Sequence, residues 1–368
     1  AQDKVTFDSA GHVTSDNATS MSKKDLGDKY GMKDKSSIKK EWFEQVEAFE
    51  KWAVGKTVEE VLNMPTTQKD EKHTVTADKD LMTGCTIGVT AFQQALEKAA
   101  KNAVEVKDVA SVGSAILTEV SGKDATAEKS GEAKANSTYG VVALDKDGKV
   151  VFTQTDEAQN VVKFTTAGAL DGEAMAVPTK GEKKDEYGMK KASAIGKEWF
   201  EQNQAFDEWT VGKTSNEISG MKVTTNEGGK TVTADKDLMT GCTISVTGFQ
   251  QALDKAVKNA VEVKNVASVG SAILTEVSGK DATAEKSGEA KASSTYGVVA
   301  LDNDGKVVFT QTDVAQNAVK FTTAGALDGE AVAVATKGEK KDEYGMKKVS
   351  SIGKEWFEQN QAFDEWTV

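Results

Sequence analysis

The sequence predicts an α+β protein built from tandem repeated domains, each a small antiparallel sheet packed with helices. Three observations predict this class. Long stretches of the chain recur at a constant offset of 157 residues, each copy contains a hairpin signal, and each copy contains a helix with one apolar face. A period of this length is that of a whole domain, since solenoid units repeat about every 20 to 50 residues.

The repeat keeps its register along the chain. Residues 80–86 recur without change at 237–243. The tetrapeptide at 41–44 recurs at 198–201 and again at 355–358. The third copy is partial, because no further copy of residues 80–86 follows it. Near identity between the copies indicates a recent duplication.

Two segments have the composition of a linker. Residues 121–137 and 278–294 are small, polar and charged, with no apolar period. We therefore expect a first domain over residues 1–120 with an incomplete N-terminal hairpin, a second over 138–277, and a partial third repeat over 295–368. The phase of the domains stays open, because the strand after the 80–86 segment can pair with either neighbouring hairpin.

The composition excludes several partners. The chain has 46 basic and 58 acidic residues, a formal net charge of −12, and every basic residue is lysine. An acidic chain without arginine is not expected to bind nucleic acid.

No apolar run approaches the roughly 18 residues of a membrane helix. The first residues lack the pattern of a signal peptide, so we expect any export segment to have been removed or never present.

The β-rich part of each unit begins with a hairpin. Two runs rich in β-branched residues start at Tyr139 and flank a turn at Gly148. The Asp-x-Asp-Gly sequence at this turn also begins calcium loops, but the further ligands are missing, which favours a plain turn. We expect a further strand at 162–166, with a counterpart at 5–9, and another strand at 113–120.

The helical part of each unit follows the hairpin. Apolar residues at steps of three or four define one helix face: Ile38, Trp42, Val46, Phe49 and Trp52. The aromatic side chains of Trp42 and Phe43 are expected in the core rather than at a cofactor. Residues 57–60 and 214–217 have the capping-box pattern that starts a second short helix.

Residues 80–86 run directly into another helical pattern. Its apolar face contains Val89, Phe92, Leu96 and Ala99. We therefore expect Thr83 and Thr86 at a helix N-terminus, where unpaired backbone N–H groups favour a phosphate, with Gly84 allowing close approach. From the residues alone, these threonines are equally open to interpretation as simple helix N-caps.

Residues 80–86 and 237–243 resemble the flavinylation motif of the FMN-binding domain family. That motif reads Asp, two variable residues, Ser or Thr, Gly, Ala and Thr, and this chain has cysteine in place of the alanine. The matching positions are Asp80, Thr83, Gly84, Cys85 and Thr86, and Asp237, Thr240, Gly241, Cys242 and Thr243. The resemblance implies that Thr86 and Thr243 each carry one FMN through a phosphodiester bond, made by a separate flavin transferase with FAD as the donor.

An upstream loop extends the resemblance. The segments Tyr30-Gly31-Met32 and Tyr187-Gly188-Met189 are similar to the family's Glu-Thr-Pro-Gly loop beside the flavin ring, without its threonine and proline. The whole chain resembles flavinylated surface lipoproteins of Gram-positive extracellular electron transfer. This implies a cell-surface location, a lipid anchor on an N-terminal cysteine absent from this chain, a membrane quinol-linked electron donor and extracellular acceptors.

The remaining chemistry favours a redox carrier over an enzyme. His12 and His73 have no counterparts in the second copy, so no histidine-based catalytic or metal site is shared. Two alternatives stay open: a flavin-dependent reductase, for which a catalytic arginine is missing, and a cofactor-free adhesive repeat protein.

One cysteine per copy excludes a disulfide within a domain. Cys85 and Cys242 are interpreted as packing residues, with a redox-active thiol as the alternative.

Overall fold

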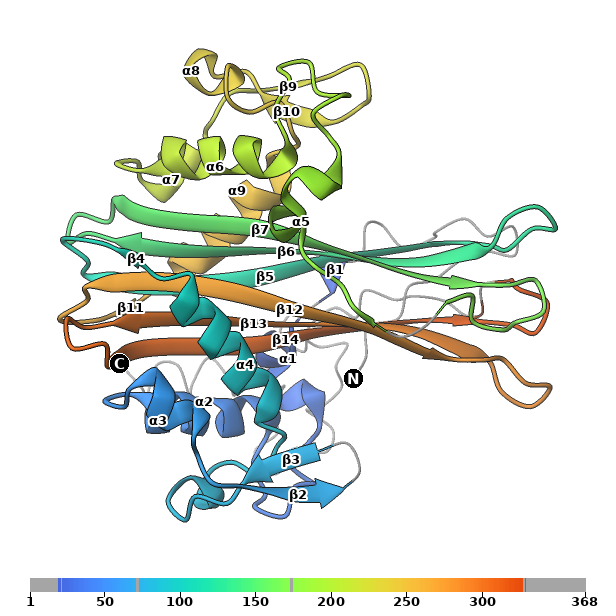
Figure 1. The fold of residues 1–368 in the computed structure, drawn as a ribbon, viewed down its shortest axis with the longest axis horizontal. Helices are drawn as coiled ribbons and strands as arrows, with labels where there is room; N and C mark the ends of the chain where they lie inside the picture. The colour runs from blue at the N-terminus through green and yellow to red at the C-terminus, as the bar shows by residue number, and fades with distance from the viewer. Residues whose placement is uncertain (1–18, 21, 71–72, 173–174, 327, 329–368) are drawn as a thin grey trace, which may run out of the picture.

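The chain is an α+β protein made of antiparallel sheets and helices, as its sequence predicts (Figure 1). The computed structural model describes residues 19–20, 22–70, 73–172, 175–326 and 328. Several expected features lie outside these residues: the strand at 5–9, a third Tyr-Gly-Met sequence at 344–346, and the third copy of the tetrapeptide at 355–358.

Two three-stranded meanders form the centre of the molecule. One contains β5 (Ser111–Lys123), β6 (Gly131–Leu144) and β7 (Val150–Phe164); the other contains β12 (Ser268–Lys280), β13 (Gly288–Leu301) and β14 (Val307–Phe321). The hairpin prediction is confirmed: β6 and β7 flank a turn in which Gly148 has φ 74°. The separate strand expected at 162–166 is instead the end of β7.

In place of the solvated linkers expected at 121–137 and 278–294, the structure has strand ends and a turn. Val120 is paired with Ala135, and the ladder continues to Lys123 opposite Glu132. Ala133 and Ala135 are buried, while Glu132 and Lys134 are partly exposed. The small alanines alternate with charged residues at the period of a strand, and their apolar signal is too weak to distinguish a strand from a linker.

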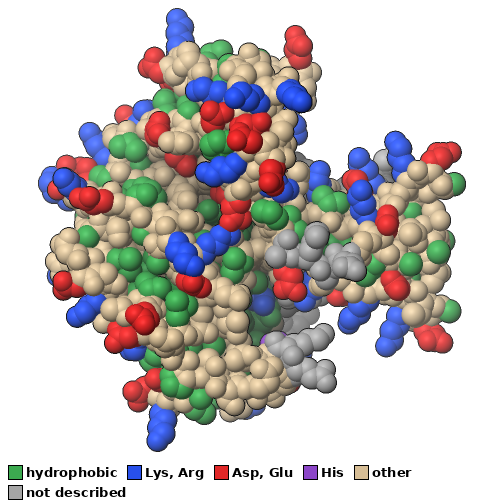
Figure 2. Space-filling model, in the orientation of Figure 1, with side chains coloured by type: hydrophobic (Ala, Val, Ile, Leu, Met, Phe, Trp, Pro, Cys, Tyr) green, Lys and Arg blue, Asp and Glu red, His purple; other side chains and the backbone are tan. Residues whose placement is uncertain are grey.

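The two meanders pack face to face. Ile116 and Tyr139 of the first meet Ile273 and Tyr296 of the second in one buried cluster. Further along the strands, Phe164 and Phe321 stack with ring centroids 4.5 Å apart. The strand ends extend beyond the helices in Figure 1, and Figure 2 shows them as a narrower projection from the main body, with lysines and acidic residues interspersed over this face.

Helices cover the outer face of each meander (Figure 1). On the β12–β14 side the helices are α1 (Lys23–Leu26), α2 (Trp42–Ala53), α3 (Val58–Leu62) and α4 (Thr90–Lys101). On the β5–β7 side they are α5 (Lys180–Lys183), α6 (Trp199–Thr210), α7 (Ser215–Ser219), α8 (Lys236–Met239) and α9 (Thr247–Lys258). The capping boxes predicted at Thr57 and Thr214 are confirmed at the starts of α3 and α7.

Short strands complete the arrangement. The hairpins β2–β3 (Thr66–Asp70, His73–Thr76) and β9–β10 (Val223–Thr225, Thr231–Thr233) stand apart from the central sheets. At the sheet edges, β1 (Thr19–Ser20) and β11 (Val261–Glu262) pair with β5, whereas β4 (Val104–Glu105) and β8 (Met175–Ala176) pair with β12.

The helices of the first copy therefore pack against strands from the far end of the chain. Trp42, Phe49 and Phe92 share one core with Val299 and Val314. The close approach of α4 to β12 requires a glycine, because a Cβ on Gly270 would lie 2.2 Å from the Ala99 carbonyl oxygen. This packing groups the chain differently from the boundaries expected at 1–120, 138–277 and 295–368.

Candidate functional site

A cavity of about 610 Å³ brings together two of the predicted site segments. Thr86 lines it together with Tyr30 and Met32 of the upstream loop and with Trp42 at the start of α2. The volume lies in the range of roughly 300–1,000 Å³ that is usual for small-molecule sites. The motif and the Tyr-Gly-Met loop thus contribute to one cavity.

The β12–β14 meander also contributes to the wall of this cavity. Glu276, Ser293, Thr295 and Val314 line it. Three lysines also line the cavity, Lys23, Lys35 and Lys69, and Lys69 donates a hydrogen bond to the Thr86 carbonyl at 3.3 Å. The cavity therefore combines aromatic surface with cationic groups close to the threonine.

Thr86 is held in place by the buried side chain of Gln45. The backbone N–H of Thr86 donates to Gln45 Oε1 at 2.9 Å, and its hydroxyl donates to the same oxygen at 3.1 Å. The amide nitrogen of Gln45 donates to the Ser36 hydroxyl at 3.1 Å and to the Lys40 carbonyl at 2.9 Å. These donor contacts fix which end of the amide faces Thr86.

The Tyr-Gly-Met loop is tied to the same end of α2. The Glu41 carboxylate accepts hydrogen bonds from the N–H groups of Met32 at 2.8 Å and Lys33 at 2.9 Å. Gly31 has φ 71°, in the left-handed region that favours glycine. Glu41 and Gln45 are one helical turn apart, so one helix end positions both the loop and Thr86.

The second copy has the same framework. Gln202 Oε1 accepts from the Thr243 N–H at 2.8 Å and from its hydroxyl at 2.9 Å. Glu198 accepts from the Met189 N–H at 2.8 Å, and Gly188 has φ 73°. The arrangement around each threonine is thus a reproducible property of the repeat.

The prediction that the motif threonines lie at a helix N-terminus is wrong. α4 begins at Thr90, after Thr83 and Thr86, and α9 begins at Thr247 in the second copy. Before α4, Gly88 forms an isolated antiparallel bridge with Val75 of β3, and the Val89 N–H donates to the Thr74 carbonyl of β3 at 3.0 Å. This pairing delays the start of the helix. A phosphate on Thr86 would therefore not sit on the N-terminus of α4.

The other motif residues lie outside the cavity lining. Asp80, Thr83, Asp237 and Thr240 are exposed, and each threonine hydroxyl donates to the carbonyl of its own turn. Gly84 and Gly241 have a packing role: a Cβ at these positions would lie 2.7 Å from Ala48 and 2.8 Å from Ala205. These glycines allow the motif to approach the helix that carries the glutamine.

Cys85 and Cys242 are free thiols with no exposed surface. Burial raises the pKa of each thiol to about 11. A reactive cysteine requires a lowered pKa and access to solvent. The packing interpretation of both cysteines is therefore favoured over the redox one.

A lysine lies over the aromatic rings of each site. Lys23 Nζ is 5.3 Å from the ring centre of Tyr30 and 5.4 Å from that of Trp42. Lys180 has the same relation to Tyr187 and Trp199, at 5.6 Å each. Burial and then the charge of Lys291 lower the pKa of Lys23 to about 8, against an opposing contribution from Asp313.

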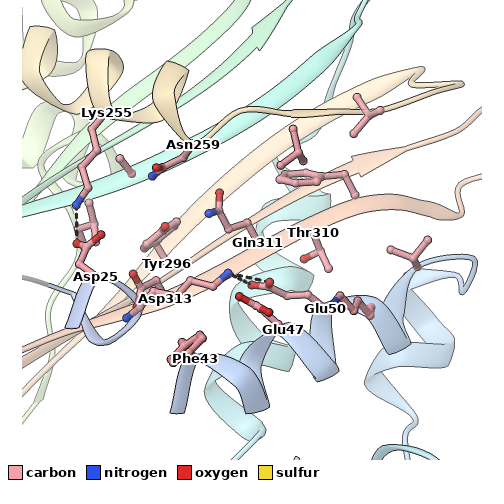
Figure 3. A pocket seen from close by; sticks show the side chains of 18 of the residues that line it. Asp25, Phe43, Glu47, Glu50, Lys255, Asn259, Tyr296, Thr310, Gln311 and Asp313 are labelled. Carbon is pink, nitrogen blue, oxygen red and sulfur yellow. Dashed lines mark hydrogen bonds and ion pairs between the residues drawn. The ribbon is translucent and has the colours of Figure 1, made fainter. Parts of the chain in front are cut away.

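A second cavity of about 610 Å³ is lined by residues of α1, α2 and β14 together with residues of α9 and β5 (Figure 3). Asp25 of α1 pairs with Lys255 of α9 at 2.5 Å, and Lys24 pairs with Glu50 at 2.8 Å. The buried Asp313 carboxylate accepts from the Lys24 N–H at 3.0 Å. No predicted site residue lines this cavity.

Sequence reasoning missed the residues that hold the site together. Glu41, Gln45 and Lys23, with Glu198, Gln202 and Lys180 in the second copy, were not singled out. A signal was present, because Glu41 and Gln45 sit beside the apolar stripe of α2 at helical spacing and are buried. A buried polar side chain needs hydrogen-bond partners, and these proved to be the site segments.

No protein-family model matches the chain, and no curated protein is similar to it. Among the described residues, none of the helices has both the length and the apolar character needed to span a bilayer. The same part of the chain contains no group of three or more His, Cys, Asp or Glu side chains arranged to hold a metal ion.

Proposed function

We propose that the protein is an extracellular electron carrier in which Thr86 and Thr243 each bear one covalently attached FMN. The observation that carries the proposal is the placement of Thr86: its hydroxyl is oriented by Gln45 beside a cavity lined by Tyr30, Met32 and Trp42. Aromatic side chains suit a flavin ring, and nearby lysines suit its phosphate. The flavin supplies the redox chemistry when bound.

The attachment uses the threonine hydroxyl as the nucleophile. The Thr86 oxygen forms a bond to the phosphorus of the FMN half of FAD, the pyrophosphate P–O bond breaks, and AMP leaves. The hydroxyl proton passes to a base of the flavin transferase. Gln45 Oε1 accepts that proton's hydrogen bond beforehand, so it orients the hydroxyl while the oxygen lone pairs stay free.

The surface location is part of the same proposal. It rests on the resemblance to flavinylated lipoproteins of Gram-positive bacteria, with a lipid anchor upstream of this chain. The electron donor is a membrane quinol-linked protein, the acceptors are extracellular, and the protein itself acts as a carrier without substrate turnover.

The test is the intact mass of protein produced together with a flavin transferase. We expect an increase of two FMN units less two waters, and peptide mapping should place one flavin on each of Thr86 and Thr243. The flavin colour should survive denaturation. A mass equal to that of the bare chain would reject covalent flavin and favour a cofactor-free surface repeat protein.

A further inference from the structure

The two sites differ at the wall position beside the lysine that lies over the aromatic rings. Lys180 Nζ pairs with Glu157 of β7 at 2.8 Å. The position one repeat later than Glu157 is Val314 of β14, which is buried and lines the cavity beside Lys23. Among the described residues no salt bridge joins Lys23 to a carboxylate. The lysine over the aromatic rings thus has an ion-pair partner in the second site that its counterpart in the first site lacks.

The other charged positions of the wall differ in the same direction. Three lysines and two carboxylates line the first cavity: Lys23, Lys35, Lys69, Asp70 and Glu276. The wall positions one repeat away hold two lysines and three carboxylates: Lys180, Lys230, Glu119, Glu157 and Glu227. Of these, Lys230 corresponds to His73 and Glu157 to Val314 of the first cavity. The surroundings of Thr86 are therefore more positive than those of Thr243.

We propose that the two flavin sites are unequal in reduction potential, and that the flavin at Thr86 is easier to reduce than the flavin at Thr243. This inference rests on the proposed function. Adding two electrons and one proton to the neutral flavin ring leaves one negative charge on it. A cation nearby stabilises that charge, and a paired cation stabilises it less. Lys23 is the cation, and Val314 leaves it without the carboxylate that Lys180 has.

The charge of Lys23 is available at neutral pH. With a pKa of about 8, its amine is mostly protonated at pH 7. The charge of Asp313 on β14 acts against that of Lys23, and Lys291 on β13 adds to the positive field. Electrons would therefore collect first at the Thr86 site and reach the Thr243 site only at a lower ambient potential.

The test compares two single-site proteins made with the transferase. Thr243→Ala leaves flavin on Thr86 alone, and Thr86→Ala leaves it on Thr243 alone, each confirmed by intact mass. Both are titrated at pH 7 with dithionite and redox dyes. At equal ambient potential we expect a reduced-to-oxidised ratio at least about tenfold higher for the Thr86 site, which is about 30 mV for a two-electron couple.

Charge variants separate the lysine from other differences. In the protein with flavin on Thr86, Val314→Glu should lower the reduction potential. Val314→Gln introduces a side chain of the same size as glutamate but without its charge, and should lower the potential less. In the protein with flavin on Thr243, Glu157→Gln should raise the potential. Without flavin, Val314→Glu should also raise the pKa of Lys23, measured from the pH dependence of its acetylation by peptide mass.

The outcomes distinguish this inference from the proposed function. If protein produced with the transferase gains no mass from covalent flavin, the proposed function is rejected. The pKa of Lys23 in the flavin-free protein then tests the charge difference by itself. Loaded proteins with equal potentials overturn the inference while leaving the proposed function intact. Equal effects of Val314→Glu and Val314→Gln, on both potential and Lys23 pKa, also overturn it.

Discussion

The Oε1 atom of Gln45 accepts hydrogen bonds from both the backbone N–H and the hydroxyl of Thr86, at 2.9 and 3.1 Å. Gln45 belongs to α2, and Thr86 belongs to a loop 41 residues later in the chain. The same pair recurs as Gln202 and Thr243. Each threonine is therefore oriented by a buried amide rather than by the end of a helix.

Removing this amide should slow flavin attachment at one site only. We expect Gln45→Leu to lower the initial rate of flavin addition to Thr86 at least about tenfold, because the hydroxyl loses its orientation. The Thr86 N–H, which is partly buried, also loses its partner, which costs up to about 1–3 kcal/mol of stability. Peptide mass spectrometry over time measures the rates. Gln202→Leu is the matched control and should affect Thr243 instead; unchanged rates at Thr86 would contradict the prediction.

The threonine hydroxyl itself should be indispensable. Thr86→Ala removes the oxygen that forms the ester, so intact mass should fall by one flavin while Thr243 stays loaded. Thr86→Ser retains a hydroxyl beside Gln45 and should keep the flavin. Flavin on the Thr86→Ala peptide would show that attachment does not use this residue.

The sequence predicted the local elements well and their assembly poorly. The Gly148 turn and the capping boxes at Thr57 and Thr214 are set by residues adjacent in the chain, and all three are present. Which sheet α4 covers depends on contacts such as that between Ala99 and Gly270, far apart in the sequence. Near-identical repeats offer α4 two similar sheets, so no local pattern distinguishes them.

The candidate site shows the same division. The motif and the Tyr-Gly-Met loop were identified, and Thr86, Tyr30 and Met32 line one cavity. The helix start expected at Thr86 was wrong because Gly88 and Val89 pair with β3, and α4 begins only at Thr90. Gln45 was overlooked because its role is defined only by the loop and threonine that it touches in the folded chain.

Cross-linking should confirm which sheet α4 covers. A Cβ on Gly297 of β13 would lie 3.0 Å from the Ala95 Cβ, close to the roughly 3.5–4.5 Å of a disulfide. In a Cys85→Ala, Cys242→Ala background, we expect Ala95→Cys with Gly297→Cys to form an intrachain disulfide, detected by peptide mass under oxidation. Ala95→Cys with Gly140→Cys, the equivalent position of β6, should not. The reverse result would place α4 on the other sheet.

The native cysteines should be dispensable for redox function. Both thiols are fully buried, and burial raises their pKa to about 11. We expect Cys85→Ala with Cys242→Ala to keep both flavins and most electron transfer, at a cost on the order of 1 kcal/mol. Native protein should react with iodoacetamide far more slowly than unfolded protein. A variant that is fully flavinylated yet cannot reduce an external acceptor would place the thiols in the electron path.

The buried carboxyl of Asp313 should make stability depend on pH. Burial, and next the charge of Asp25, raise its pKa to about 7 (Figure 3). The unfolded chain has an aspartate pKa of about 3.9, so between these values the folded state binds more protons than the unfolded state. The contribution of Asp313 is thus fully present below about pH 4 and is lost as pH rises through 7.

Asp313→Asn should remove this dependence. The backbone N–H groups of Lys24 and Val314 both donate to Oδ1, at 3.0 and 2.7 Å, and the asparagine oxygen can accept both. Denaturant unfolding from pH 4 to pH 8 should show the variant gaining stability over the native chain by up to a few kcal/mol as pH rises. Asp156→Asn is the matched control: burial raises the pKa of Asp156 to about 6, so its gain should be smaller and complete at a lower pH. Parallel stability curves for Asp313→Asn and the native chain would mean that Asp313 ionises as readily in the folded protein as in the unfolded one.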